Sequence, residues 1–272
     1  MKFTYLGTAA AEGFPAVFCN CVHCKEARRL GGKNIRTRSQ SLINDDLLID
    51  LPADTYCHFL ANGIEGDKIK YLLVTHSHPD HLYPAELEMR SGCFAHNMRA
   101  PKLQIFCSKG AFEAVKTKVP ENEGYELNLI KPFEKFTLEG YEITPLAARH
   151  MEGDDAVFYV VKGEKTLLYA HDTGFFFEEV FDFIKKENLY FDFITLDCTN
   201  VDIPISDSGT HMGLPNIDRL MKRLEELSAV DENTVKYVNH FSHNAEPLQH
   251  VLEEKVSEKG FKVAFDGEIF EI

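Results

Sequence analysis

The sequence predicts an α/β fold in which strands and helices pack in layers. Short apolar runs rich in Val, Ile, Phe and Tyr recur along all 272 residues, and amphipathic helical patterns separate several of the later runs. Because the strands first follow one another closely and later alternate with helices, we expect both hairpins and crossover connections. Histidine or aspartate follows several strand ends, where the loops of layered α/β folds converge on a ligand crevice.

The predicted elements share strong apolar periodicity, and turn residues separate them. The expected strands are residues 2–6, 41–44, 47–51, 70–74, 103–107, 141–146, 157–161, 166–170, 191–197, 235–240, 261–265 and 268–272. The expected helices are residues 52–63, 108–119, 177–188, 214–227 and 246–260. Pro215 in a first helical turn and Gly260 at a helix end support two of these boundaries. No segment resembles a linker, so we expect one domain over 1–272.

Composition narrows the class of function. With 29 basic and 43 acidic residues the formal charge is −14, which disfavours a long nucleic acid as partner. A small anionic substrate remains compatible if metal ions supply positive charge locally. We expect a cytoplasmic protein without a membrane segment, because no early apolar region resembles a secretory signal and no run reaches ~18 apolar residues. The odd number of cysteines, seven, fits a reducing compartment.

The segment VTHSHPDHL, directly after the apolar run KYLLV, holds the densest group of candidate ligands. A solvated turn is the alternative, since Pro and Asp favour turns. Metal ligation is favoured because imidazole and carboxylate suit divalent first-row metals. Alternate residues of a tight loop can direct His76 and His78 to one side and Asp80 and His81 to the other. Two such pairs are typical of a dinuclear centre with ions ~3.5–4 Å apart.

Further candidate ligands lie at other strand ends. His150 follows YEITPLAAR, Asp172 follows TLLYAH, and His240 ends VKYVNH. Each alone would more often be a structural residue, but together with HxHxDH they favour a metal site. Asp50 and Asp197, also at strand ends, are expected to orient ligand imidazoles.

The ordered motifs THSHPDH, AARH, YAHDTG and VNH resemble those of the metallo-β-lactamase superfamily. The resemblance implies an αβ/βα four-layer sandwich with a dinuclear centre between the sheets. His76, His78 and His150 would then hold one metal ion, and Asp80, His81 and His240 the other. Asp172 would bridge the two ions.

Cys19, Cys21 and Cys24 form a C-x-C-x-x-C pattern in the segment 13–24, which we expect to be a loop. A reactive or redox set is one interpretation, and three ligands of a structural Zn²⁺ is the other. A third thiol two residues upstream of the CxxC favours zinc. The fourth ligand could be His23, but His243, three residues past His240, is preferred. Cys57, Cys93, Cys107 and Cys198 match no ligand position.

The N-terminal segment GTAAAEGFPAVFCNCVHC, together with TLDCT, GTHMGLP, VNHFSH and GFKVAFDG, resembles one branch of the superfamily. That branch contains the PhnP-type cyclic phosphodiesterases of the carbon–phosphorus lyase pathway. The resemblance extends from about Phe3 to the C-terminus, supports His243 as the fourth zinc ligand and allows a homodimer.

His211 lies in the polar loop that precedes the helix 214–227. A surface histidine is the alternative to a catalytic role. The resemblance favours a general acid near the leaving group, or a side chain that positions the phosphate. His171, adjacent to Asp172, is expected either to support the ligands from behind or to be structural, and His58, His96 and His250 are expected to lack partners.

These observations predict a metal-dependent phosphodiesterase that acts on a small, cyclic phosphate ester. Two Mn²⁺ or Zn²⁺ ions would bridge a hydroxide of lowered pKa, with Asp80 and Asp172 among the catalytic residues and His211 as proton donor. Alternatives are hydrolysis of a lactone or thioester, RNA 3′-processing, or a non-hydrolytic metal-binding role resembling pyrroloquinoline-quinone biosynthesis protein B.

Overall fold

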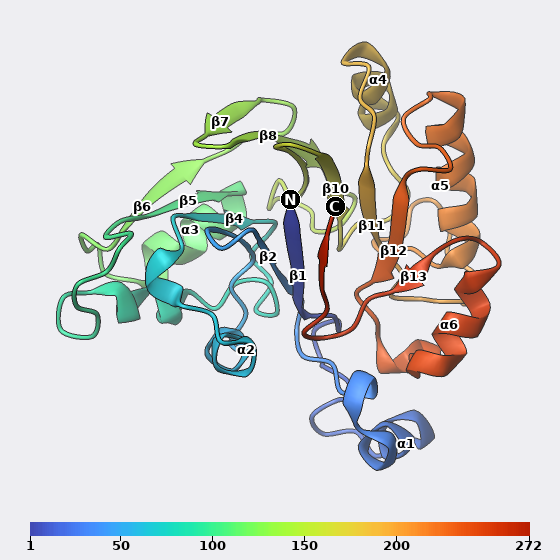
Figure 1. Ribbon diagram of the computed structural model, residues 1–272, viewed down its shortest axis with the longest axis horizontal. Coiled ribbons are helices and arrows are strands. Elements are labelled where there is room, and N and C mark those ends of the chain that lie inside the picture. Colours follow the sequence, from blue (N-terminus) through green and yellow to red (C-terminus); the bar gives the residue numbers. More distant parts are fainter.

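Two seven-stranded sheets face each other in the structure, a computed structural model that describes residues 1–272 (Figure 1). The first sheet has the order β14-β1-β2-β3-β4-β5-β6 and the second β13-β12-β11-β10-β9-β8-β7. The strands of the first sheet are β1 (Lys2–Gly7), β2 (Gln40–Ile43), β3 (Leu47–Ile49), β4 (Tyr71–Val74), β5 (Leu103–Cys107), β6 (Tyr125–Leu129) and β14 (Ile269–Glu271). Those of the second are β7 (Phe136–Leu138), β8 (Tyr141–Ala147), β9 (Val157–Lys162), β10 (Thr166–Ala170), β11 (Phe193–Asp197), β12 (Val235–Asn239) and β13 (Lys262–Val263).

Helices cover the outer face of each sheet. The helices α2 (Thr55–Asn62) and α3 (Lys109–Lys118) lie against the first sheet, and α4 (Glu178–Lys186), α5 (Leu214–Glu226) and α6 (Gln249–Ser257) against the second (Figure 1). The helix α1 (Val22–Leu30) lies apart at one end of the molecule. Short 3₁₀ helices span Gly32–Asn34, Gly66–Lys68, Pro84–Arg90 and His243–Ala245. The predicted αβ/βα sandwich is confirmed. None of the helices has the length and apolar composition that a membrane span requires.

Strand periodicity sorts the side chains into these layers. In β10, Leu167 and Tyr169 belong to the aromatic-rich core between the sheets, whereas Leu168 and Ala170 belong to the core under the helices of the second sheet. Successive strand residues point to opposite faces, so a strand buried on both faces must be apolar throughout. This is why the central strands appear in the sequence as continuous apolar runs.

All twelve predicted strands and all five predicted helices are present; two strands and one α-helix, besides the four short 3₁₀ helices, are not predicted. The strands β6 and β7 lie at sheet edges, and their side chains are largely exposed or half-buried, so apolar alternation is weak. The helix α1 buries only Cys24 and Ala27, and its sequence VHCKEARRL is short and mostly polar, so no apolar run marks it in the sequence. The expectation that the cysteine segment is entirely loop is wrong in this respect: Cys21 caps α1, its Sγ accepting a hydrogen bond from the Cys24 N–H.

Parallel pairing brings the chemically important strand ends together. Strands β3 and β4 are parallel neighbours, as are β10, β11 and β12. Their carboxyl ends therefore meet at one edge of each sheet, and the loops that follow them meet between the sheets. His76 and His81 follow β4, Asp172 follows β10, and His240 follows β12.

Candidate metal centres

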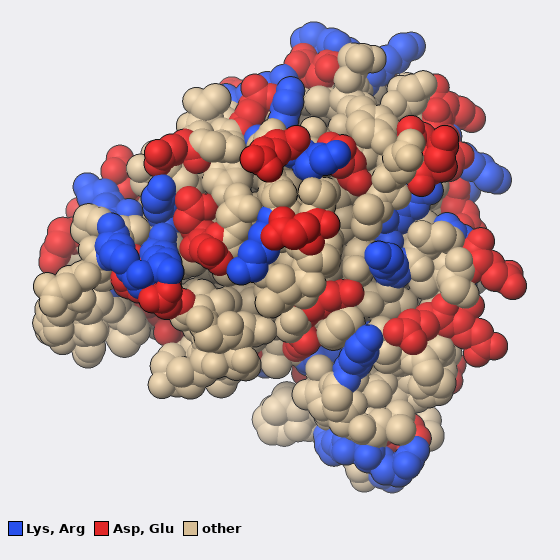
Figure 2. Space-filling view, viewed as in Figure 1, with Lys and Arg blue, Asp and Glu red and all other residues tan.

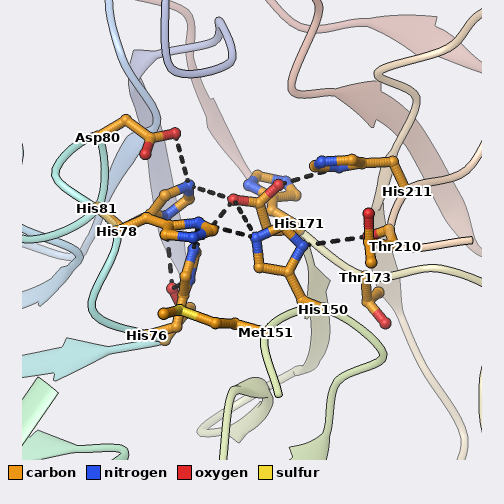
Figure 3. Close-up of polar contacts among 12 residues, drawn as sticks. His76, His78, Asp80, His81, His150, Met151, His171, Thr173, Thr210 and His211 are labelled. Carbon is orange, nitrogen blue, oxygen red and sulfur yellow. Dashed lines mark hydrogen bonds and ion pairs between the residues drawn. The ribbon is translucent and has the colours of Figure 1, made fainter. Parts of the chain in front are cut away.

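The first group of ligand atoms gathers around His78 (Figure 3). Its Nδ1 lies 3.0 Å from His76 Nε2 and 3.0 Å from His150 Nε2. Asp172 Oδ2 lies 3.4 Å from His76 Nε2 and 3.7 Å from His150 Nε2. Two nitrogen ligands of a tetrahedral ion, each ~2.0–2.1 Å from it, stand about 3.3 Å apart. The spacing therefore suits one divalent cation.

The second group gathers around His81 Nε2. This atom lies 2.7 Å from Asp172 Oδ2, 3.4 Å from Asp80 Oδ2 and 3.4 Å from His240 Nε2. Asp80, His81, Asp172 and His240 offer four ligand atoms within 4.8 Å of one another, and all four side chains are buried. The same oxygen, Asp172 Oδ2, belongs to both groups.

Left-handed backbone conformations at strand ends direct two of these ligand side chains, and that of Asp50, into the site. Asp50 after β3, Asp172 after β10 and His240 after β12 have φ of 65°, 49° and 64°. Non-glycine residues rarely adopt positive φ, and where they do the surrounding structure must stabilise the conformation. The conformation turns the chain sharply at the strand end, which lets the side chain face the space between the sheets.

Hydrogen bonds fix the orientation of the histidine rings. His81 Nδ1–H donates to Asp50 Oδ2 at 2.6 Å, and His240 Nδ1–H donates to Thr199 Oγ1 at 2.9 Å. His150 Nδ1–H donates to the Thr210 carbonyl at 3.2 Å. With Nδ1 engaged in this way, the Nε2 of each ring is the nitrogen that would bind a metal ion, and such outer partners are typical of metal-binding histidines. The hydrogen bond between His81 and Asp50 is the kind expected of a residue that orients a ligand imidazole.

The electrostatics of the site also fit cations. Asp50, Asp80, Asp172 and Asp197 are all buried, and their ion-pair partners are histidines, with no lysine or arginine among them. Buried carboxylates need compensating positive charge. Burial lowers the pKa of His76 and of His150. Both imidazoles are therefore neutral at physiological pH, the form that binds metals.

His211 lies beside the second group on the loop before α5. Its Nδ1–H donates to Asp197 Oδ2 at 3.0 Å and lies 3.1 Å from Asp172 Oδ1. Burial opposes protonation, but the charges of Asp197 and Asp172 outweigh it and raise the pKa of His211 to about 11. The other nitrogen, Nε2, makes no hydrogen bond within the protein. His211 can therefore hold a proton on Nε2 for a bound molecule.

A cavity of about 280 Å³ opens onto these groups. It is lined by Ala10, Ala11, Glu12, His78, Asp80, His150, Asp172, Thr199, His211, His240 and Ser242. This volume is near the lower end of the ~300–1,000 Å³ that is usual for ligand pockets. The site is therefore suited to a small molecule.

The cysteine cluster forms a separate donor set. Cys19, Cys21, Cys24 and His243 place their ligand atoms within 4.8 Å of one another. His243 Nδ1 lies 3.7 Å from Cys21 Sγ and 3.7 Å from Cys24 Sγ. With Zn–S of ~2.3 Å and Zn–N of ~2.0–2.1 Å, a tetrahedral ion separates such atoms by about 3.6 Å. The set therefore fits a Zn²⁺ ion, and His23 does not take part.

Comparison with known proteins agrees with this geometry. The profile of the β-lactamase superfamily domain matches residues 54–241. The chain belongs to the β-lactamase superfamily. The match confirms the predicted family, and divalent-metal binding is a property of this fold.

Curated and solved members of the β-lactamase superfamily resemble the whole chain. A protein of Acinetobacter baumannii (strain ACICU) named coenzyme PQQ synthesis protein B is 24% identical in an alignment of 317 positions, gaps included, that covers 98% of each chain. A diphosphatase from the PhnP family has a TM-score of 0.74 at 22% identity, covering 100% of this chain and 97% of its own. Zn²⁺-bound PqqB from Methylobacterium extorquens has a TM-score of 0.74 at 18% identity and 100% coverage of both chains. These structural likenesses support the predicted fold and the PhnP resemblance.

Sequence reasoning missed several polar contacts of this superfamily member. Thr199 and Glu12 line the cavity; they lie in the segments TLDCT and GTAAAEGFPAVFCNCVHC, but neither residue was given a role. The expectation that His58 lacks partners is wrong, because it is buried and bonded to Gln40 Oε1 and Thr37 Oγ1, each at 2.6 Å. Its position on the inward face of α2 is the signal that could have found it.

Proposed function

We propose that this protein is a metal-dependent phosphodiesterase that hydrolyses a small, cyclic phosphate ester. One observation carries the proposal: Asp172 Oδ2 lies 3.4 Å from His76 Nε2 of the first group and 2.7 Å from His81 Nε2 of the second, and His211 Nδ1 lies 3.1 Å from Asp172 Oδ1. Two adjacent cation sites and a proton donor are what an in-line displacement at phosphorus requires. The small cavity supports a small ester rather than a polymer.

The ligand assignments are part of the proposal. His76, His78 and His150 would hold one Mn²⁺ or Zn²⁺ ion, Asp80, His81 and His240 the other, and Asp172 would contact both. Cys19, Cys21, Cys24 and His243 would hold a structural Zn²⁺. Paired divalent ions at such a site supply Lewis acidity to phosphoryl oxygens and lower the pKa of water from 15.7 toward ~7.

The chain's own residues would then complete the reaction. His211 holds a proton on Nε2, because its Nδ1–H donates to Asp197, whose carboxylate stabilises the imidazolium from that side. It donates that proton to the oxygen that leaves phosphorus. Asp50 and Thr199 hold the imidazole rings of His81 and His240 in a fixed orientation. The ligand nitrogens therefore stay in place as negative charge develops on the phosphoryl oxygens.

The charge pattern supports a small substrate over a long RNA. On the face shown in Figure 2, lysine and arginine are interspersed with aspartate and glutamate and form no continuous basic track. Together with the net charge of −14, this weighs against RNA 3′-processing. A cytoplasmic location and a homodimer remain part of the proposal.

Turnover of bis(p-nitrophenyl) phosphate with added Mn²⁺ tests the proposal. We expect hydrolysis by the wild-type protein, and a loss of ~10²–10⁴-fold in kcat for His211→Ala with metal content unchanged. His96→Ala, which alters an exposed histidine, is the matched control. Loss of metal from His211→Ala would contradict its role as a proton donor.

A second candidate is a non-hydrolytic metal-binding protein. It is favoured by the likeness to coenzyme PQQ synthesis protein B, which extends over 98% of both chains. Full metal occupancy without turnover of any phosphodiester would favour this candidate.

A further inference from the structure

The cavity wall has two chemically different parts. Seven of its lining residues belong to the candidate metal centre or contact it: His78, Asp80, His150, Asp172, Thr199, His211 and His240. The remaining four, Ala10, Ala11, Glu12 and Ser242, come from the N-terminal loop and from the segment after β12. A substrate whose phosphate occupies the first part can place its organic group against the second.

The N-terminal loop is fixed in this position by its backbone. The Ala10 N–H donates to the Phe241 carbonyl at 3.0 Å, and the Phe241 N–H donates to the Thr8 carbonyl at 3.1 Å. Arg38 Nε donates to the Ala11 carbonyl at 2.9 Å. The loop therefore lies along the end of β12, between the candidate dinuclear centre and the cysteine set.

Glu12 is held by one oxygen and presents the other. Its Oε1 accepts hydrogen bonds from Ser242 Oγ at 2.6 Å and from the His243 N–H at 3.3 Å. Its Oε2 has no hydrogen-bond partner in the protein, and the side chain is 29% exposed. One carboxylate oxygen thus anchors the side chain, and the second remains available to a ligand.

The other residues of this wall cannot substitute for Glu12. Ala10 and Ala11 have no polar side chain. The Ser242 hydroxyl gives its proton to Glu12 and accepts from Asn244 N at 3.2 Å and from Asn244 Nδ2 at 3.1 Å. Glu12 Oε2 is therefore the free polar side-chain atom in this part of the wall.

We propose that Glu12 determines specificity, by accepting a hydrogen bond from a hydroxyl of the substrate's organic group and by repelling a second phosphate. A carboxylate can only accept, so its ligand must donate, as a sugar hydroxyl does. Its negative charge disfavours a substrate with a further anionic group in that position. The inference rests on the proposed function and names its substrate class: a hydroxylated phosphate ester rather than a diphosphate.

The experiment uses Glu12→Gln, which keeps the shape but replaces the free acceptor by a donor and removes the charge. The first readout is the ratio of kcat/KM for uridine 2′,3′-cyclic phosphate, which carries a hydroxyl, to that for bis(p-nitrophenyl) phosphate, which carries none. We expect this ratio to fall about tenfold, as for loss of one hydrogen bond to a charged group. Glu232→Gln removes one charge from an exposed loop and is the matched control, with an unchanged ratio expected.

The second readout is the affinity of the metal-loaded protein for pyrophosphate relative to phosphate, measured by calorimetry. We expect Glu12→Gln to bind pyrophosphate more tightly relative to phosphate than the wild type does. If the wild type hydrolyses neither ester, the proposed function fails, but this affinity ratio still tests Glu12. Unchanged ratios in both readouts would overturn the inference. Loss of zinc from the cysteine set in Glu12→Gln would also overturn it, since Glu12 would then only hold the loop.

Discussion

The two donor sets of this protein lie close together but are built in different ways. The histidine–aspartate centre takes its side chains from strand ends of both sheets, and its position is fixed by the packing of two large cores and the aromatic layer between the sheets. The cysteine set lies on a loop and a short helix with a core cluster of only six buried residues. In the first set, packing of the cores fixes the ligands without a metal ion. In the second, a bound metal ion would itself stabilise the local structure.

The two donor sets also differ in whether a substrate can reach them. The second group of candidate ligands (Asp80, His81, Asp172 and His240) is buried yet borders the cavity, and its rings are oriented by Asp50 and Thr199. The cysteine set supplies four protein ligands and leaves no position for a substrate. His240 and His243, three residues apart, divide between the two, because the chain turns sharply after β12.

The strongest test of this contrast removes the oxygen that both ligand groups share. Asp172→Ala should deplete both ions of the dinuclear centre and bring turnover to the uncatalysed level, because neither group keeps its full set of ligands. Elemental analysis should still find about one zinc at the cysteine set. Asp182→Ala, an exposed aspartate of α4, is the control. Retention of all metal in Asp172→Ala would mean that the carboxylate is not a bridging ligand.

Cys21→Ser tests the other half of the comparison and should have a smaller effect on turnover. Serine is a good N-cap, so α1 keeps its cap while the thiolate ligand is lost. We expect loss of about one zinc and a lower Tm, by about 2–4 °C for each kcal/mol of folding free energy lost. The exposed Cys57 provides the control Cys57→Ser. An unchanged zinc content would exclude Cys21 from the site.

The smallest expected effect concerns a histidine that belongs to neither set. Burial lowers the pKa of His58 to about 4, although Asp54 opposes the shift. Because the folded-state pKa lies below the unfolded value of ~6.5, the stabilisation is present above pH ~6.5 and is lost as the pH falls toward 4. In the wild type, the free energy of unfolding measured in urea should fall by up to about 3 kcal/mol between these pH values because of His58. In His58→Gln this part of the pH dependence should be absent. His96→Gln should behave as the wild type, and an equal pH slope in both variants would contradict this role for His58.

The strands of the sandwich could be predicted because burial on both faces requires continuous apolar runs such as YLLV and TLLYA. The edge strands β6 and β7 were not predicted, since they bury too few side chains to leave a periodic pattern. The helix α1 was not predicted because it is short and mostly polar. The candidate ligands were likewise visible from their places after strands. Thr199 and Glu12 lie within the quoted segments TLDCT and GTAAAEGFPAVFCNCVHC, but nothing there marks either residue until the fold shows that it lines the cavity.

The sequence by itself determined which chemical groups stand at which strand ends, and it separated a cysteine set from a histidine–aspartate set. Only the tertiary structure decided that Asp172 Oδ2 belongs to both ligand groups, that His243 rather than His23 joins the cysteines, and that Glu12 faces the cavity. Spacing along a chain limits distances only between near neighbours. The distance between residues such as Glu12 and Ser242 is set by strand pairing and by the packing of one sheet on the other.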